Sequence, residues 1–242
     1  MSLNDSSIEL ARTPPADFYT DPAQFAREGH SVLRRCWQYV GHTGQLRSHG
    51  EYFTTRIGRE PLLLLRDAEV IRGFFNVCRH RAGPLAQGCG NLSRIVCGYH
   101  GWTYSLQGQL LRAAEMDGAQ PFDPAGIRLE PLQIHVLGPM IFAALDPQTP
   151  DFDSFHADVA AQCAPFQLER MRHVLTREYP VAANWKVYVD NYLEGYHVPL
   201  VHPALNREIE YRSYATVLGA HHVLQHAPVR ADTASRYSQV AC

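Results

Sequence analysis

The chain has 242 residues, 45% of them hydrophobic, which suffices for one large domain or two ordinary domains with buried cores. The net charge is −2, with 22 Lys and Arg against 24 Asp and Glu, which argues against a surface for nucleic acid or an anionic membrane. No apolar run reaches the length of a membrane span and no secretory signal opens the chain, so we expect a cytoplasmic protein.

The type of predicted element changes along the chain. Residues 1–35 are expected to be a helical lead-in, with a helix opening at Pro22. Short apolar runs separated by turn residues then predict strands at 52–57, 62–65, 74–77, 95–96, 103–106, 109–111, 132–137 and 140–145. A four-residue turn, 58–61, is expected between the first two. This pattern is typical of a small antiparallel barrel or sandwich.

Two short segments each carry one cysteine and one histidine. Cys78 and His80 form a C-x-H motif, and sixteen residues later Cys97 and His100 form a C-x-x-H motif. Two thiolates and two imidazoles can hold one zinc ion or a two-iron, two-sulfur cluster. Structural zinc sites usually pair Cys with Cys and His with His, whereas a Rieske centre binds one iron by cysteines and the other by histidines. One ligand of each kind per loop favours the cluster, and a zinc ribbon remains the alternative.

The residues around these motifs resemble one branch of Rieske proteins. High-potential respiratory Rieske centres carry an extra cysteine three residues after the first histidine, and here that position is Gly83. The motif is therefore similar to the ferredoxin and oxygenase branch, which implies a lower potential suited to a flavin or ferredoxin donor. The other cysteines lack paired spacing and are expected to be free thiols: Cys36, Cys89, Cys163 and Cys242.

A second informative run follows Asn184, which is expected to cap a helix. That helix would place Asp190, Glu194 and His197 on one polar stripe among apolar and aromatic residues. Burying such a stripe without partners would cost about 1–3 kcal/mol per unsatisfied group. A metal ion is therefore the expected partner.

A bend is expected after His197, because Pro199 cannot continue a helix without losing a backbone hydrogen bond. On a straight helix His197 and His202 would diverge by about 140°. The bend would bring them together. Two histidines and one carboxylate with open positions form the facial triad of non-heme Fe(II) oxygenases. The alternative is a surface helix with two unrelated histidines.

Together the two runs resemble the α subunits of Rieske non-heme iron oxygenases, also called aromatic ring-hydroxylating oxygenases. The resemblance implies an α+β fold: a small antiparallel β Rieske domain over 36–146, then the beginning of a helix-grip-like catalytic domain over 147–242. Residues 1–35 would pack on that catalytic part.

The same resemblance implies the metal ligands and the partners. A [2Fe-2S] cluster would be held by Cys78, His80, Cys97 and His100, and a mononuclear Fe(II) by His197 and His202, with Glu194 as the electron-bridging carboxylate. The electron donor would be a flavin or ferredoxin reductase, and the substrates O2 and a small molecule. The full-length subunit would form a head-to-tail homotrimer in which electrons cross between subunits.

One expected ligand is missing from the chain. The family takes its third iron ligand, an aspartate, from far downstream, whereas this chain ends forty residues past His202. The remaining acids do not match that position and are expected to be solvated charges: Glu208, Glu210 and Asp232. We therefore expect the N-terminal portion of an oxygenase α subunit, lacking the C-terminal part of its catalytic domain.

Three functions stay open. The chain is either an oxygenase that hydroxylates a small organic substrate or a truncated, inactive Rieske electron-transfer protein, with a non-catalytic partner of a longer α subunit as a third possibility. Glu194, in place of aspartate, resembles the branch acting on quaternary ammonium compounds, with aromatic acids as the alternative. Tyr188, Tyr192 and Tyr196 would then either face the cation or pack in a core.

Overall fold

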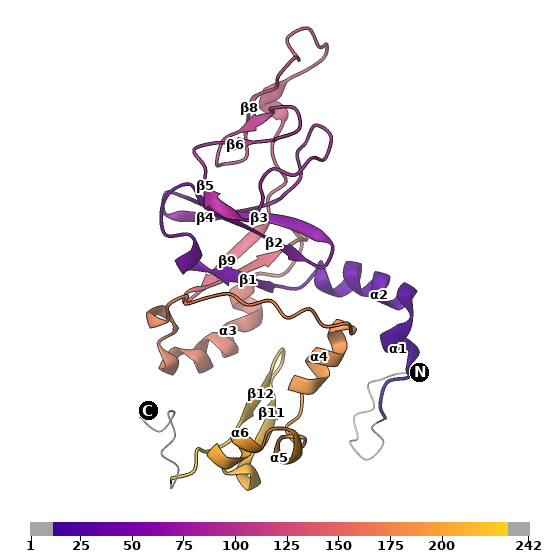
Figure 1. Cartoon of the computed structure of the whole chain (residues 1–242), viewed down its shortest axis with the longest axis vertical. Helices are drawn as coiled ribbons and strands as arrows, with labels where there is room; N and C mark the ends of the chain where they lie inside the picture. The colour runs from indigo at the N-terminus through magenta and orange to yellow at the C-terminus, as the bar shows by residue number, and fades with distance from the viewer. Residues whose placement is uncertain (1–11, 232–242) are drawn as a thin grey trace. The chain divides into compact units, whose positions relative to one another are not determined.

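The computed structural model describes residues 12–231. The chain forms two compact units. The β-rich unit comprises Glu28–Ser154 and Phe166–Thr176, and the helical unit comprises Met1–Arg27, Phe155–Pro165 and Arg177–Cys242. Helices and antiparallel strands occur together, which confirms the predicted α+β class (Figure 1). Within the described residues, no helix is long and apolar enough to cross a membrane.

The described strands of the β-rich unit all pair in the antiparallel sense. Its strands are β1 Gln38–His42, β2 Glu51–Ile57, β3 Glu60–Asp67, β4 Val70–Phe75, β5 Cys89–Asn91, β6 Ile95–Val96, β7 Thr103–Tyr104, β8 Leu110–Arg112, β9 Gln133–Leu137 and β10 Met140–Ala144. They form three sheets, ordered β4-β3-β2-β5, β1-β10-β9 and β6-β7-β8. In Figure 1, β6 and β8 lie on one side of the four-stranded sheet, and β1 and β9 lie on the other.

Several strand boundaries differ from the prediction. The turn between β2 and β3 has two residues, not four, because Ile57 pairs with Glu60 and Gly58 turns the chain at a φ of +57°. Strand β4 ends at Phe75, before the predicted 74–77 run does. Strands β1 and β5 were not predicted. Gly41 interrupts the β1 pattern at a register shift, and β5 contains no strong strand former.

Strand β3 is buried on both faces. Leu62, Leu63, Leu64 and Leu65 are all 0% exposed. Side chains alternate along a strand, so Leu62 and Leu64 join one core while Leu63 and Leu65 join a second core that also contains Cys78. The consecutive leucines are thus the signature of a strand covered on both sides.

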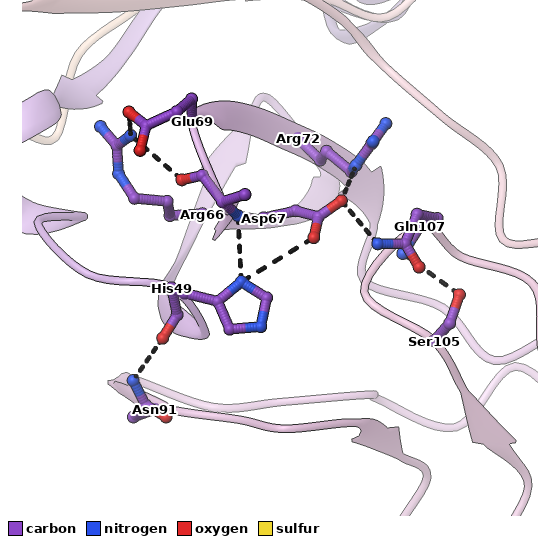
Figure 2. Close-up of polar contacts among 9 residues, drawn as sticks. His49, Arg66, Asp67, Glu69, Arg72, Asn91, Ser105 and Gln107 are labelled. Atoms are coloured by element: carbon purple, nitrogen blue, oxygen red, sulfur yellow. Dashed lines mark hydrogen bonds and ion pairs between the residues drawn. The ribbon is translucent and has the colours of Figure 1, made fainter.

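A buried carboxylate at the end of β3 links two sheets of this unit (Figure 2). Asp67 Oδ2 accepts hydrogen bonds from Arg72 Nε at 2.8 Å and Gln107 Nε2 at 2.6 Å. The bond from Arg72 is the largest cause that holds the pKa of Asp67 below its usual range. His49 Nδ1, which accepts from Ala68 N, lies 3.8 Å from Asp67 Oδ1. Because Gln107 lies between β7 and β8, this contact ties their sheet to β3.

The remaining elements are short. They are α1 Asp17–Thr20, α2 Pro22–Glu28, α3 Phe152–Cys163, α4 Trp185–Tyr192, α5 Val198–Val201, α6 Pro203–Glu208, β11 Ala215–Leu218 and β12 Val223–His226. The predicted helix start at Pro22 is confirmed, with the Asp21 carboxylate accepting from the first-turn amides. Cys36, Cys89 and Cys163 are free thiols, as predicted, and Cys242 lies outside the described residues.

The two cores on β3 generate a prediction. Leu62→Ala and Leu63→Ala should each lower the free energy of unfolding by about 2–5 kcal/mol, since both remove fully buried methyl groups. Of these two leucines, only Leu63 shares its core with Cys78 and Cys97, so Leu63→Ala should also speed loss of a cluster held by these cysteines. Denaturant titration and the decay of visible absorbance measure the two effects. Equal decay rates in equally destabilised variants would contradict two separate cores.

Candidate metal centres

The first candidate loop follows β4 and is closed by hydrogen bonds near Cys78 and at its base. Cys78 is 3% exposed, and its amide donates to Gly83 O at 2.8 Å. The buried Asn76 spans the base of the loop, where its Oδ1 accepts from Leu85 N and Ala86 N, each at 3.0 Å. Asn76 therefore presets the loop shape, a role that its place in the motif did not reveal.

The second candidate loop joins β6 to β7. Cys97 is 2% exposed, and its amide donates to Trp102 O at 2.9 Å. Gly101 returns the chain at a φ of +71°, a conformation that side chains with a Cβ rarely adopt. The two loops approach closely, because a Cβ on Gly83 would lie 3.3 Å from Cys97 Sγ.

All four predicted cluster residues meet at the facing ends of these loops. Cys78 and Cys97 belong to one buried core. The rings of His80 and His100 are half-buried, with centroids 4.7 Å apart, and His80 stacks on Trp102 at 4.7 Å with an interplanar angle of 6°. The sulfurs therefore lie inside, and the imidazoles lie at the rim.

The chemistry of these groups fits a [2Fe-2S] cluster. Burial raises the pKa of the Cys78 thiol, and the neighbouring Cys97 raises it further, so thiolates here require a positive partner. Burial also lowers the pKa of His80, which favours the neutral imidazole that binds metals. His80 Nδ1 is buried, and no described residue hydrogen-bonds to it. Among residues 12–231, no three His, Cys, Asp or Glu side chains are grouped so that they could hold one ion. A Rieske cluster does not need such a group, because each of its irons takes only two protein ligands.

Tyr104 is a further residue of this centre that sequence reasoning missed. It is 0% exposed, and its hydroxyl lies 3.2 Å from Cys78 Sγ and accepts from Arg79 N at 3.2 Å. Burial raises the pKa of Tyr104 well above its usual range, so the hydroxyl keeps its proton. Because Arg79 N occupies an acceptor position of the oxygen, that proton is available to the sulfur.

The second predicted centre begins with α4. Asn184 caps this helix as predicted, since its Oδ1 accepts from Lys186 N at 3.1 Å. The helix ends at Tyr192, however, so the prediction of one polar stripe through Glu194 and His197 is wrong. Asp190 instead accepts a 2.7 Å hydrogen bond from the Tyr19 hydroxyl.

The turn after α4 is organised by Glu194. Its Oε2 accepts from Tyr196 N at 2.6 Å and His197 N at 3.3 Å, and its Oε1 contacts His197 Nδ1. Burial alone would raise the pKa of Glu194, but the hydrogen bonds from His197 and the backbone hold it below its usual range. With Nδ1 engaged, His197 keeps Nε2 for another partner, the arrangement common for metal-binding histidines.

His197 and His202 come together across the bend. His197 precedes α5, His202 separates α5 from α6, and their ring centroids lie 5.2 Å apart. Both line a pocket of about 570 Å³ together with Glu194. Two imidazoles oriented in this way fit part of a mononuclear iron site.

The other predicted residues are distributed differently. Glu208 and Glu210 do not line this pocket, and Asp232 lies outside the described residues. Of the three tyrosines, Tyr192 lines the pocket, while Tyr188 packs against Tyr192 with ring centroids 5.2 Å apart and Tyr196 is 79% exposed.

Tyr104→Phe should lower the reduction potential of the cluster, because a hydrogen bond to sulfur stabilises the reduced, more negative form. A bond of about 1 kcal/mol corresponds to roughly 40–50 mV for one electron. Protein-film voltammetry would measure the shift. Tyr52→Phe is the matched control, since Tyr52 packs on the same core but donates to Gln87 O at 3.2 Å. Equal potentials in the wild type and Tyr104→Phe would contradict the assigned bond.

Comparison with protein families supports both centres. A model of the Rieske [2Fe-2S] domain matches residues 36–123, and a model of the ring hydroxylating alpha subunit (catalytic domain) matches residues 168–239. The first match contains both Cys/His loops. The second contains Glu194 and both histidines of the bend.

Curated relatives match most of this chain but only part of their own length. Choline monooxygenase of Arabidopsis thaliana is 37% identical over 87% of this chain and 53% of the relative. The glycine betaine monooxygenase oxygenase subunit of Chromohalobacter salexigens is 36% identical over 81% of this chain and 45% of the relative. The chain thus spans about half the length of the curated relatives it matches.

Solved structures agree. The quaternary ammonium Rieske monooxygenase CntA, with its substrate L-carnitine, superposes with a TM-score of 0.82 at 28% identity over 90% of this chain and 63% of CntA. Naphthalene 1,2-dioxygenase superposes with a TM-score of 0.67 at 25% identity over 74% of this chain and 42% of that structure. The chain therefore belongs to the Rieske oxygenase α-subunit family, with a Rieske domain and part of the catalytic domain.

Proposed function

We propose that this chain serves a Rieske monooxygenase that hydroxylates a quaternary ammonium compound. The observation that carries the proposal is the arrangement of Glu194, His197 and His202 in one pocket, with the carboxylate on the Nδ1 side of His197. Glu194 both organises the turn through the Tyr196 and His197 amides and engages one nitrogen of a histidine that lines the pocket. The arrangement suits a metal that must keep open positions for reaction.

Each centre has a distinct role. The cluster bound by Cys78, His80, Cys97 and His100 would receive electrons, and the half-buried histidine edge would be their exit. Iron held by His197 and His202 would supply the activation of O2. Glu194, held ionised by its hydrogen bonds, would orient His197 and bridge electron flow from a cluster histidine of a neighbouring subunit.

The partners follow from the same proposal. A relative named as an oxygenase subunit points to a separate electron-donating component, so we expect a flavin or ferredoxin reductase. Inter-subunit electron transfer is described for CntA, which supports a homotrimer for the full-length subunit. A cytoplasmic location stays a prediction, and the name of the Arabidopsis relative places that protein in the chloroplast.

The substrate class rests on the relatives and on one tyrosine. The named substrates of the relatives include choline, glycine betaine and L-carnitine, all quaternary ammonium compounds. Tyr192 lines the histidine pocket and offers an aromatic face to a cation. Aromatic acids, the alternative considered from the sequence, have less support.

The second candidate function is an electron-transfer protein with an inactive catalytic part. It is favoured by the ligand count, because among the described residues no three candidate ligands are grouped around one ion, and the carboxylate of Glu194 in the pocket is engaged by His197. That function needs only the cluster, whose four residues are complete.

A single-turnover experiment separates the two functions. The protein is reduced anaerobically with dithionite, freed of reductant, and exposed to O2 with choline, glycine betaine, carnitine or benzoate. We expect a hydroxylated or dealkylated product from a quaternary ammonium compound and none from benzoate. His197→Ala should reduce the product yield at least about 100-fold while leaving the cluster spectrum unchanged.

His226→Ala is the matched control, because His226 is an exposed histidine of β12 that does not line the pocket. Cluster reoxidation without product from any of the four compounds would favour the electron-transfer function instead. Product from benzoate alone would contradict the proposed substrate class.

A further inference from the structure

The C-terminal end of α4 is held by the β11–β12 hairpin. Tyr192 is the last residue of the helix, so its carbonyl has no intrahelical donor. Gln225 of β12 supplies one, since its Nε2 donates to Tyr192 O. Gln225 Oε1 in turn accepts from the hydroxyl of Tyr214, which directly precedes β11. Tyr214 thus bonds Gln225, and Gln225 bonds the end of α4.

The ring of Tyr214 also covers the turn that follows α4. Gly195 is buried, and a Cβ added there would overlap the ring and hydroxyl of Tyr214. Only glycine permits this approach. The backbone between Glu194 and Tyr196 is therefore held by the hydrogen bond from Tyr196 N to Glu194 and by contact with the ring of Tyr214.

Tyr214 and Gln225 line the same pocket as His197 and His202. Their hydrogen bonds run to each other and to the end of α4, so their influence on the histidines passes through the turn. The turn carries Glu194, whose carboxylate holds both the amide and the Nδ1 of His197. Moving the end of α4 would shift this carboxylate and rotate the imidazole.

We propose that Tyr214 and Gln225 are positioning residues for the mononuclear metal site. They hold the turn from 193 to 197 in the shape that leaves His197 Nε2 for the metal beside His202. This inference rests on the proposed function, since it assumes that the two histidines bind iron. It means that metal binding at His197 and His202 also depends on Tyr214 and Gln225, which lie outside the histidine motif.

The test measures metal affinity with the cluster in place. Cluster-loaded protein is dialysed anaerobically against Fe(II), and the cluster iron, quantified by EPR, is subtracted. Tyr214→Phe and Gln225→Met should each weaken Fe(II) binding about 10–100-fold, as expected for residues that orient a ligand from outside the coordination sphere. The cluster EPR signal and the unfolding midpoint should stay unchanged.

Two controls separate positioning from general damage. Tyr211→Phe removes a hydroxyl from the adjoining turn, one that no described residue bonds, and should bind Fe(II) as the wild type does. The double variant Tyr214→Phe/Gln225→Met should be no weaker than Gln225→Met alone, because the Tyr214 hydroxyl acts through Gln225. Wild-type affinity in both single variants, or additive losses in the double variant, would overturn the inference.

A second measurement needs no metal and distinguishes this inference from the proposed function. The amides of Tyr196 and His197 donate to Glu194, and their hydrogen exchange should become faster in Tyr214→Phe and Gln225→Met. Wild-type protein that binds no extra Fe(II) would defeat the proposed metal site, even if exchange responds. Unchanged exchange, with Fe(II) bound equally by wild type and variants, would defeat the positioning role alone.

Discussion

Burial of β3 on both faces is the constraint from which the β-rich unit is built. Its four consecutive leucines are fully buried, so each face must be covered by another layer. One layer is the β1-β10-β9 sheet, whose Ile141 packs with Leu62 and Leu64. The other is the β6-β7-β8 part, whose core includes the two candidate cluster cysteines. The two candidate cluster cysteines are thus part of a hydrophobic core of the unit.

That core buries both cysteines, and for Cys78 burial raises the pKa of the thiol and disfavours the thiolate. Cluster iron would offset this cost, and hydrogen bonds to Cys78 from the Tyr104 hydroxyl and the His80 backbone favour the negative sulfur. Two residues farther from the cysteines support the two candidate loops. Asn76 closes the first loop, and Asp67 ties Gln107 to β3. The helical unit uses a different device, in which one carboxylate, Glu194, organises a turn.

The sequence predicted the parts of this structure that local chemistry determines. The Cys/His loops, the helix start at Pro22, the cap at Asn184 and most strands follow from spacing and propensity. The end of α4 did not, because no residue near position 193 forbids a helix. The helix ends there because Glu194 bonds the next amides and Gln225 captures the Tyr192 carbonyl, a contact from 33 positions away.

Long-range contacts explain the other differences as well. Tyr104 and Cys78 are 26 positions apart, so no local pattern marks the tyrosine as a partner of the sulfur. Strand β5 exists because Cys89 and its neighbours pair with β2, although Cys-Gly-Asn has little strand propensity. The domain boundaries and the individual ligand assignments stay predictions.

Counting metal is the most direct test of two separate iron centres in this chain. Iron and acid-labile sulfide per chain would be determined on anaerobically purified, Fe(II)-supplemented protein, with EPR of the dithionite-reduced form. We expect about three irons and two sulfides with a Rieske signal, falling to about two irons in His197→Ala. Two irons in both proteins would contradict the second centre, and zinc without sulfide would contradict the first.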